Sequence, residues 1–194
     1  MPSLHDVVEQ TLAAYEVGAF PMAEDGQLGF FTSEPRSVLL FDQVHVSKRL
    51  MRIYRQKPFE LTMDRDFSAV VTSCREGRPE WISEELMTVY NELHRMGVSR
   101  SFEAWLGNEL VGGIMGTQVG GLFMAESMFR RKDHASNLCI VFMLEVLKSC
   151  GFDGCDIQYA NEHTQKFQPV EMSSEEFSVF FEKAKSHWPK LRIP

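Results

Sequence analysis

Hydrophobic residues recur at helical spacing in several segments of the chain, and each segment is bounded by a capping residue or a glycine. The longest segment begins at Asp133 or Ser136 and runs through Leu147. It is apolar almost all round, so this helix is expected to be buried against a sheet. The predicted helices cover residues 4–15, 48–56, 84–96, 133–147 and 174–185.

Short apolar runs between turn residues predict the strands of a sheet. Residues 101–106 and 109–116 flank the Gly107-Asn108 turn and predict a hairpin, to which residues 122–125 can add a third antiparallel strand. A strand at 154–159 follows the buried helix at once. The remaining predicted strands cover residues 28–31 and 38–44. This order predicts an α+β fold with a mixed sheet and flanking helices, although the pattern leaves the topology open.

The composition is that of one main globular domain. The chain has 194 residues, 44% of them hydrophobic, which suffices for one core without disulfides or structural metals. The formal net charge of -7 argues against phosphate binding over the whole surface. A local basic patch can still bind a nucleic acid when the rest of the surface is acidic.

The cysteines and the first residues favour a cytoplasmic protein. The chain has no Cys-x-x-Cys pair, and its cysteines are expected to be free thiols: Cys74, Cys139, Cys150 and Cys155. Residues 1–10 show no secretory signal. The longest apolar run, 138–144, is too short to span a bilayer, so no membrane contact is expected.

Glu126 stands out because it is a single carboxylate among Met124, Met128 and Phe129. Burial of a charge in such surroundings is costly without a partner. Two interpretations stay open. The side chain either reaches solvent at a strand end or belongs to a functional pocket.

Asp156 and Gln158 are two residues apart in a predicted strand, so both side chains are expected on one face of the sheet. A solvent-facing strand shows the same alternation. The alternative is a site in which the Asp156 carboxylate holds the Gln158 amide in one orientation.

A basic stripe is predicted on the helix at 48–56, where Lys48, Arg52 and Arg55 share one face. Such a stripe is either a solvated surface or a set of phosphate contacts. Arg130 and Arg131 follow the strand that contains Glu126 and can extend the same patch.

Several short motifs occur in a fixed order between about Tyr15 and about Thr164, which is most of the chain. Together they resemble the bacterial leucyl/phenylalanyl-tRNA-protein transferase family. Each motif is weak when taken alone, and their order and spacing carry the resemblance. The motifs are Tyr15-Glu16-Val17-Gly18-Ala19-Phe20-Pro21-Met22, Glu34-Pro35-Arg36, Trp81-Ile82, Ser101-Phe102-Glu103-Ala104-Trp105, Leu110-Val111-Gly112-Gly113, Glu126-Ser127-Met128-Phe129 and Asp156-Ile157-Gln158.

The resemblance implies an N-acetyltransferase-like (GNAT) fold, with a short N-terminal lobe at residues 1–36 and a catalytic domain at residues 37–194. It implies transfer of leucine or phenylalanine from aminoacyl-tRNA to the N-terminal amino group of acceptor proteins, which marks them for degradation. The ester of aminoacyl-tRNA is already activated, so no cofactor and no metal are expected. A monomer is expected.

The resemblance also implies roles for particular residues. Asp156 is expected to orient and polarise Gln158, which hydrogen-bonds the incoming amine or the tetrahedral centre. Glu126 is expected at the pocket mouth, facing an ammonium group. Trp81 is expected to stack on the terminal adenine or to wall the pocket. The tRNA contacts are expected at Lys48, Arg52, Arg55, Arg130 and Arg131. The candidate pocket walls are Met22, Trp81, Ile114, Phe123, Met128, Met143 and Leu147.

The chain departs from the family pattern at three places: Phe30-Phe31, Asn137 within His134-Ala135-Ser136-Asn137, and Lys166-Phe167-Gln168-Pro169. These departures leave open a changed acceptor, such as acidic N-termini, and a non-catalytic tRNA-binding relative. The choice of donor among leucine, phenylalanine and methionine also stays open. An acetyl-coenzyme A enzyme of the same fold is disfavoured, because no glycine-rich loop precedes the long helix.

Overall fold

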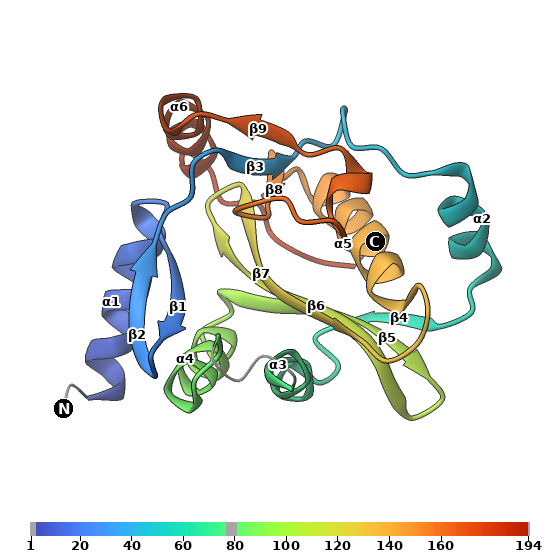
Figure 1. Cartoon of the computed structure of the whole chain (residues 1–194), viewed down its shortest axis with the longest axis horizontal. Coiled ribbons are helices and arrows are strands. Elements are labelled where there is room, and N and C mark those ends of the chain that lie inside the picture. The colour runs from blue at the N-terminus through green and yellow to red at the C-terminus, as the bar shows by residue number, and fades with distance from the viewer. Residues whose placement is uncertain (1–2, 77–80, 194) are drawn as a thin grey trace.

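The computed structural model of the protein describes residues 3–76 and 81–193, and within these ranges seven strands form a mixed central sheet in the order β4-β5-β6-β7-β8-β3-β9 (Figure 1). A separate hairpin pairs β1 (Phe20–Glu24) with β2 (Gln27–Phe31). All neighbours in the large sheet are antiparallel except β7 and β8, which are parallel. The bounds are β3 Arg36–Leu39, β4 Glu60–Met63, β5 Ser99–Leu106, β6 Glu109–Val119, β7 Leu122–Arg130, β8 Gly154–Asp156 and β9 Val170–Met172.

Helices cover both faces of this sheet, so that two hydrophobic clusters form, one on each side. One cluster joins helices α1, α3, α4 and α6 to Met115 and Met124 of the sheet. The other joins α5 to Phe102, Ile114 and Phe123. The bounds are α1 Leu4–Glu16, α2 Lys48–Gln56, α3 Phe67–Arg75, α4 Glu84–Arg95, α5 Ala135–Cys150 and α6 Ser174–Lys185, with a 3-10 turn η1 at Gln165–Phe167.

Serine residues fix where several helices begin. The Ser47 side chain accepts the backbone N–H of Leu50, and Ser83 does the same for Leu86. Ser3 and Ser173 complete capping boxes at the starts of α1 and α6. Because each cap satisfies backbone N–H groups that lack a partner in the first turn, these helix starts are encoded locally.

All the predicted helices and the β5–β6–β7 meander are confirmed. Two predicted strands are too long. The strand expected at 38–44 ends at Leu39, because Gln43 and Val44 donate their N–H groups to the Leu40 carbonyl and close a turn. The strand expected at 154–159 ends at Asp156. Strands β1, β4 and β9 and helix α3 were not predicted from the sequence.

The sheet opens where β7 and β8 separate. The two strands pair at Leu122–Met124 and Gly154–Asp156 and no further. At the same level β7 bulges against β6: Gly116 pairs with Ala125 and Met115 pairs with Ser127, which leaves Glu126 as the extra residue. Bulges commonly re-aim side chains in this way. The bulge therefore turns Glu126 into the space between the separating strands.

Gly112 of β6 allows the start of α5 to approach the sheet. A Cβ atom at this position would lie 2.6 Å from the Ala135 Cβ atom. The first turn of α5, at Ala135 and Ser136, consequently lies against β6 at Gly112.

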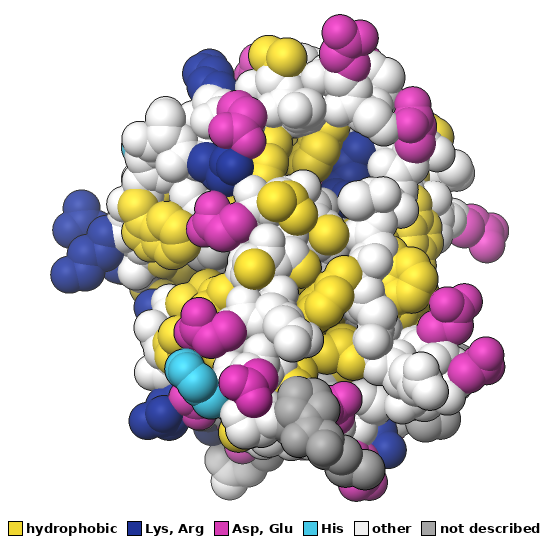
Figure 2. Space-filling view, turned by 90° about the vertical axis from the view of Figure 1, so that its left-hand side faces the viewer, with side chains coloured by type: hydrophobic (Ala, Val, Ile, Leu, Met, Phe, Trp, Pro, Cys, Tyr) yellow, Lys and Arg dark blue, Asp and Glu magenta, His cyan; other side chains and the backbone are white. Residues whose placement is uncertain are grey.

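The surface carries acidic side chains around a more hydrophobic middle on the face shown in Figure 2. This distribution agrees with the formal net charge of -7. The described part of the chain contains no helix long and apolar enough to cross a membrane.

Candidate active site

A cavity of about 270 Å³ lies where β7 and β8 separate. Its apolar wall includes Ile114 of β6, Met128 of β7 and Ile157, which follows β8. Its polar wall includes Glu126 and Gln158. The volume fits one amino-acid side chain with the atoms next to it, and it lies just below the range of about 300–1,000 Å³ typical of small-ligand sites.

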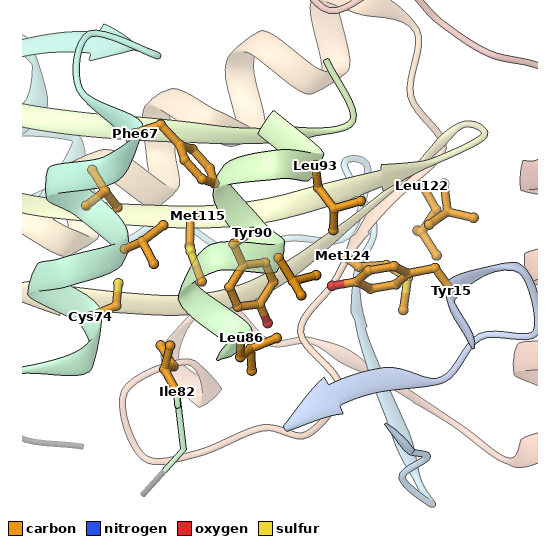
Figure 3. Close-up of a cluster of buried hydrophobic side chains, with 14 of the residues drawn as sticks. Tyr15, Phe67, Cys74, Ile82, Leu86, Tyr90, Leu93, Met115, Leu122 and Met124 are labelled. Carbon is orange, nitrogen blue, oxygen red and sulfur yellow. The ribbon is translucent and has the colours of Figure 1, made fainter. Parts of the chain in front are cut away.

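Two tyrosines hold the carboxylate of Glu126. The Tyr15 hydroxyl on α1 donates to Glu126 Oε1 at 2.9 Å, and the Tyr90 hydroxyl on α4 donates to Oε2 at 3.3 Å. Figure 3 shows both tyrosine hydroxyls turned toward the same space between the helices and the sheet. Tyr90 lines the cavity, and Tyr15 lies behind it.

Burial raises the pKa of Glu126 to about 8, against an ordinary value of 4.5. The Asp156 carboxylate also raises this pKa, while the two tyrosine hydroxyls and the Arg36 guanidinium lower it. Since a pKa near 8 lies close to neutral pH, Glu126 can both take up and release a proton under ordinary conditions.

Asp156 is a fully paired carboxylate rather than a free one. Its oxygens accept Arg36 Nε at 3.0 Å and Arg36 Nη2 at 2.6 Å, and both side chains are buried. Asp156 Oδ1 also accepts the backbone N–H of Gln158 at 2.8 Å. Asp156 does not line the cavity. Its contact with Gln158 is thus to the backbone and not to the side-chain amide.

Gln158 adopts a left-handed backbone conformation, with φ 58°. The expectation that Asp156 and Gln158 share one face of a strand is wrong, because the strand ends between them. The hydrogen bond from the Gln158 N–H to Asp156 stabilises this turn, which directs the amide toward the cavity.

Two polar side chains of the cavity lack partners within the described residues. These are Gln158, through Nε2, and Ser127, through Oγ. Both side chains are more than nine-tenths buried. Because a buried polar atom without a partner is costly, such atoms in a cavity indicate a site that water or a polar ligand completes.

Aromatic side chains form one rim of the cavity. Trp81 and Tyr159 meet edge to face with ring centroids 6.3 Å apart. The Trp81 carbonyl accepts the backbone N–H of Ala23 in β1 at 3.0 Å, which ties the rim to the hairpin. A rim of this kind offers a flat ring face to a base or to another planar group.

Basic groups lie at another edge of the cavity. Arg130 and His163 line it. Lys166 donates to Asn137 Oδ1 at 2.7 Å and lies 3.4 Å from His163 Nδ1. Burial lowers the pKa of Lys166, and the nearby Arg130 charge lowers it further. This edge is therefore electropositive and suits a negatively charged ligand group.

The structure brings together only some of the candidate residues. The cavity is lined by Trp81, Ile114, Glu126, Met128, Arg130 and Gln158. Phe123, Met143 and Leu147 are fully buried in the cluster around α5 and do not line it, and neither does Met22 of β1.

The two sets of predicted tRNA contacts differ in their surroundings. Lys48, Arg52 and Arg55 are exposed on α2 and do not line the cavity. Arg131 bonds to Ser73 at 3.0 Å and to Glu76 at 2.7 Å, so it is engaged within the molecule.

The residues that bond to the carboxylates of Glu126 and Asp156 were not identified from the sequence. Tyr15, Tyr90 and Arg36 were not predicted as site residues. Tyr15 and Arg36 do lie in the quoted motifs, and a buried carboxylate requires partners, but nothing in the sequence pairs Tyr15 with a residue 111 positions away.

The comparisons with known proteins identify the family. The model of the family described as leucyl/phenylalanyl-tRNA protein transferase matches residues 38–182. A relative with that name from Gloeobacter violaceus is 43% identical over 171 residues, which is 87% of this chain and 89% of the relative. Relatives of the same name from Rubrobacter xylanophilus and Pseudomonas paraeruginosa are 40% and 37% identical, over 87% and 92% of this chain and 90% and 81% of theirs.

Among solved structures, the structure of L-PGS from Bacillus licheniformis superposes with a TM-score of 0.45 at 10% identity, over 92% of this chain and 70% of that one. This likeness is too low to carry an argument. The class of protein is an aminoacyl-tRNA-dependent acyltransferase. The chain belongs to the leucyl/phenylalanyl-tRNA-protein transferase family.

Proposed function

We propose that the cavity between β7 and β8 joins an aminoacyl-tRNA to the N-terminal amino group of an acceptor protein, with leucine or phenylalanine as the transferred residue. Family membership supports the reaction. The observation that supports the location is one cavity that holds a carboxylate with a raised pKa and a buried amide without a partner. Those groups match the two needs of the reaction, which are deprotonation of an ammonium and stabilisation of an oxyanion.

The acceptor enters as an ammonium and must lose a proton before it can attack. Glu126 in its carboxylate form takes that proton. The amine nitrogen then attacks the ester carbonyl, a C–N bond forms, and the C–O bond to the 3′-terminal ribose breaks. The second proton of the nitrogen passes to the leaving ribose oxygen. An amide thus replaces an ester, and the atoms balance without a further reactant.

Gln158 Nε2 is the donor that faces the developing oxyanion. An amide nitrogen donates hydrogen bonds and is a very weak base, so donation is the role that its chemistry supports. Asp156 is a positioning residue: it holds the Gln158 backbone and is itself held by Arg36. A preorganised donor of this kind is worth about 3 kcal/mol in related reactions.

The apolar wall at Ile114 and Met128 receives the leucine or phenylalanine side chain. Phe123, Met143 and Leu147 lie behind this wall and set its shape through packing. Met22 belongs to β1, whose Ala23 N–H bonds to the Trp81 carbonyl at the rim. Each methylene in such a pocket discriminates by only about 1–3 kcal/mol, so both donors can be accepted.

The tRNA lies across the aromatic rim and the basic edge. Trp81 stacks on the terminal adenine, since base stacking on an aromatic ring needs no base-specific contact. Arg130 at the basic edge contacts the backbone of the acceptor end. Lys48, Arg52 and Arg55 on α2 contact phosphates further along the tRNA. Arg131 adds to the positive charge of its neighbour Arg130.

The finer points of the proposal follow the family. The separation of the parallel strands β7 and β8 supports a GNAT-like fold. We place the boundary between a short lobe and the catalytic domain near residue 36, where β3 begins. The protein acts as a monomer in the cytoplasm, and its product is marked for degradation.

The test is transfer of labelled leucine from leucyl-tRNA to peptides that begin with Arg, Lys, Asp, Glu or Met. Transfer to the Arg and Lys peptides is expected. Transfer to the acidic peptides alone would keep the chemistry and overturn the expected acceptor. Binding of the tRNA without transfer to any peptide, with leucine or phenylalanine as donor, would overturn the proposal.

A further inference from the structure

A chain of hydroxyl groups leads from Glu126 into the core, away from the cavity. Thr117 Oγ1 on β6 donates to the Tyr15 hydroxyl at 3.3 Å. Thr117 Oγ1 and Ser99 Oγ on β5 are 2.8 Å apart. Thr117 and Ser99 are buried and do not line the cavity. Thr117 lies on β6, which also contributes Ile114 to the cavity wall, and the sheet register pairs it with Ser99 of β5, so strand pairing fixes the position of both hydroxyls.

The direction of this chain follows from the number of hydrogens. Each hydroxyl has one hydrogen to donate, and a carboxylate only accepts. Tyr15 uses its hydrogen on Glu126, so its oxygen must accept from Thr117. Thr117 has then used its own hydrogen and must accept from Ser99.

The chain cannot easily run the other way. Reversal would have the Tyr15 hydroxyl donate to Thr117, and Thr117 donate to Ser99. The Ser99 hydrogen would then need a new acceptor, and within the described residues its hydroxyl oxygen bonds only to Thr117. A buried hydroxyl hydrogen without an acceptor costs free energy, so the chain runs toward Glu126.

The two oxygens of Glu126 consequently differ. Oε1 accepts the one-way chain through Tyr15. Oε2 accepts from Tyr90, which lines the cavity, whereas Tyr15, Thr117 and Ser99 do not. A proton on Glu126 is therefore favoured on Oε2, because a proton on Oε1 would require the Tyr15 hydrogen to turn away from Glu126, either back to Thr117 or to the Tyr90 hydroxyl with which Tyr15 also interacts.

We propose that Thr117 and Ser99 are positioning residues for the transfer reaction: they fix the Tyr15 hydroxyl as a donor to Glu126 Oε1, and so reserve Oε2 for proton exchange with the substrate. This inference rests on the proposed role of Glu126 as the group that takes the ammonium proton. The remaining charged and titratable groups that act on Glu126 are Asp156 and Arg36, and neither is part of the hydroxyl chain.

The test compares Thr117→Val, which removes the hydroxyl, with Thr117→Ser, which restores it. Each hydroxyl in a chain strengthens the next bond by a modest fraction, so Thr117→Val should raise the pKa of Glu126 by about half a unit, or threefold in its protonation equilibrium. Thr117→Ser should leave it unchanged. Thr11→Val is the matched control, because Thr11 is equally buried on the helix of Tyr15, but among the residues that the structure describes its hydroxyl bonds only to the Val7 carbonyl.

Two readouts are needed. The first is ¹³C NMR titration of the Glu126 carboxyl carbon without substrate, assigned by its loss in Glu126→Gln. The second is the acid limb of the pH profile of kcat/KM, which should move upward with the NMR value in Thr117→Val. The α-amino group of the acceptor titrates in the same range, but it is identical in all variants and cancels in the comparison.

The outcomes separate this inference from the proposed function. A titration of Glu126 that is the same in Thr117→Val and in Thr11→Val overturns the inference, whatever the activity. Should Thr117→Val fail to fold, Ser99→Ala gives the same comparison at the next position, with a smaller rise expected. Full transfer by Glu126→Gln would overturn the proposed role of Glu126 as the proton acceptor, and binding of the tRNA without transfer by the unsubstituted protein would overturn the proposed function. In both cases the NMR titration still decides whether the hydroxyl chain acts on Glu126.

Discussion

Glu103 on β5 and Glu126 on β7 are two carboxylates on one sheet, and their surroundings differ in kind. Glu103 is fully buried and accepts from the Arg65 and Asp66 backbones, from the Trp105 ring nitrogen and from two hydroxyls. Glu126 accepts from two tyrosine hydroxyls and faces a cavity.

The chemistry of the donors explains the difference. An N–H group can only donate, so the region around Glu103 requires a permanent acceptor and ties β4, α3 and β5 together. A hydroxyl donates or accepts, so Tyr90 can serve Glu126 in either protonation state. A carboxylate whose oxygens accept hydrogen bonds from many protein donors thus anchors the fold. A carboxylate that has two hydroxyl donors and faces a cavity can exchange protons.

The largest expected effect is on catalysis, from Glu126→Gln. This variant should lower kcat/KM for transfer by about a thousandfold, since it removes the proton acceptor but keeps the shape. The urea concentration at the midpoint of unfolding should stay at or above that of the unsubstituted protein, because the amide can bond to both Tyr15 and Tyr90. A parent-like kcat/KM would contradict the role of Glu126.

The next effect is on stability, from Arg36→Met. Removing one partner of a buried ion pair leaves Asp156 charged and unpaired, which should lower the free energy of unfolding by about 3 kcal/mol. Urea unfolding measures it. Arg95→Met is the control, because the Arg95–Glu92 pair is on the surface and should change stability by less than about 1 kcal/mol. Equal effects of the two variants would contradict the anchoring role of Asp156.

Glu103→Gln should lower the free energy of unfolding by about 2 kcal/mol, because the amide NH₂ must face donors that have no other acceptor. The folded enzyme should keep its kcat, in contrast to Glu126→Gln. Chemical unfolding and single-turnover transfer on the same preparation separate the two effects. A large loss of kcat with unchanged stability would reverse the comparison.

The smallest effect per pH unit is the pH dependence of stability. The pKa of Glu126 is about 8 in the folded protein and near the ordinary 4.5 when unfolded. At pH values between 4.5 and 8 the folded state binds more protons than the unfolded state. The stabilisation that Glu126 contributes is therefore greatest below about pH 4.5, and it is lost as the pH rises through 8. The slope should be at most about 1.4 kcal/mol per pH unit. Unfolding measured at several pH values should show a shallower slope in Glu126→Gln, and an equal slope would contradict the raised pKa.

Some helices and strands could be predicted from the sequence and others could not. Helices α2, α4 and α6 were predictable because a serine cap and an amphipathic face are local signals. Strand β4 was not, because it is four residues long and depends on pairing with β5. The end of β8 was also missed, since the turn at Gln158 depends on Asp156 and hence on Arg36 from β3.

The candidate site divides in the same way. Glu126 attracted notice in the sequence because a carboxylate among methionines and phenylalanine needs a reason. Its partners could not be identified, because Tyr15 and Tyr90 lie 111 and 36 residues away on two different helices. Phe123, Met143 and Leu147 were suitable pocket residues by type, yet packing against α5 places them outside the cavity.

The sequence by itself determined the positions of the capped helices, the β5–β6–β7 meander and, through its ordered motifs, the family. These properties depend on residues close together in the chain or on a pattern that can be read along it. Only the tertiary structure decided where β7 and β8 separate, that Asp156 is paired with Arg36, and that burial raises the pKa of Glu126. The physical reason is that the protonation of a buried carboxylate is set by the donors around it, and those donors are brought together only by folding.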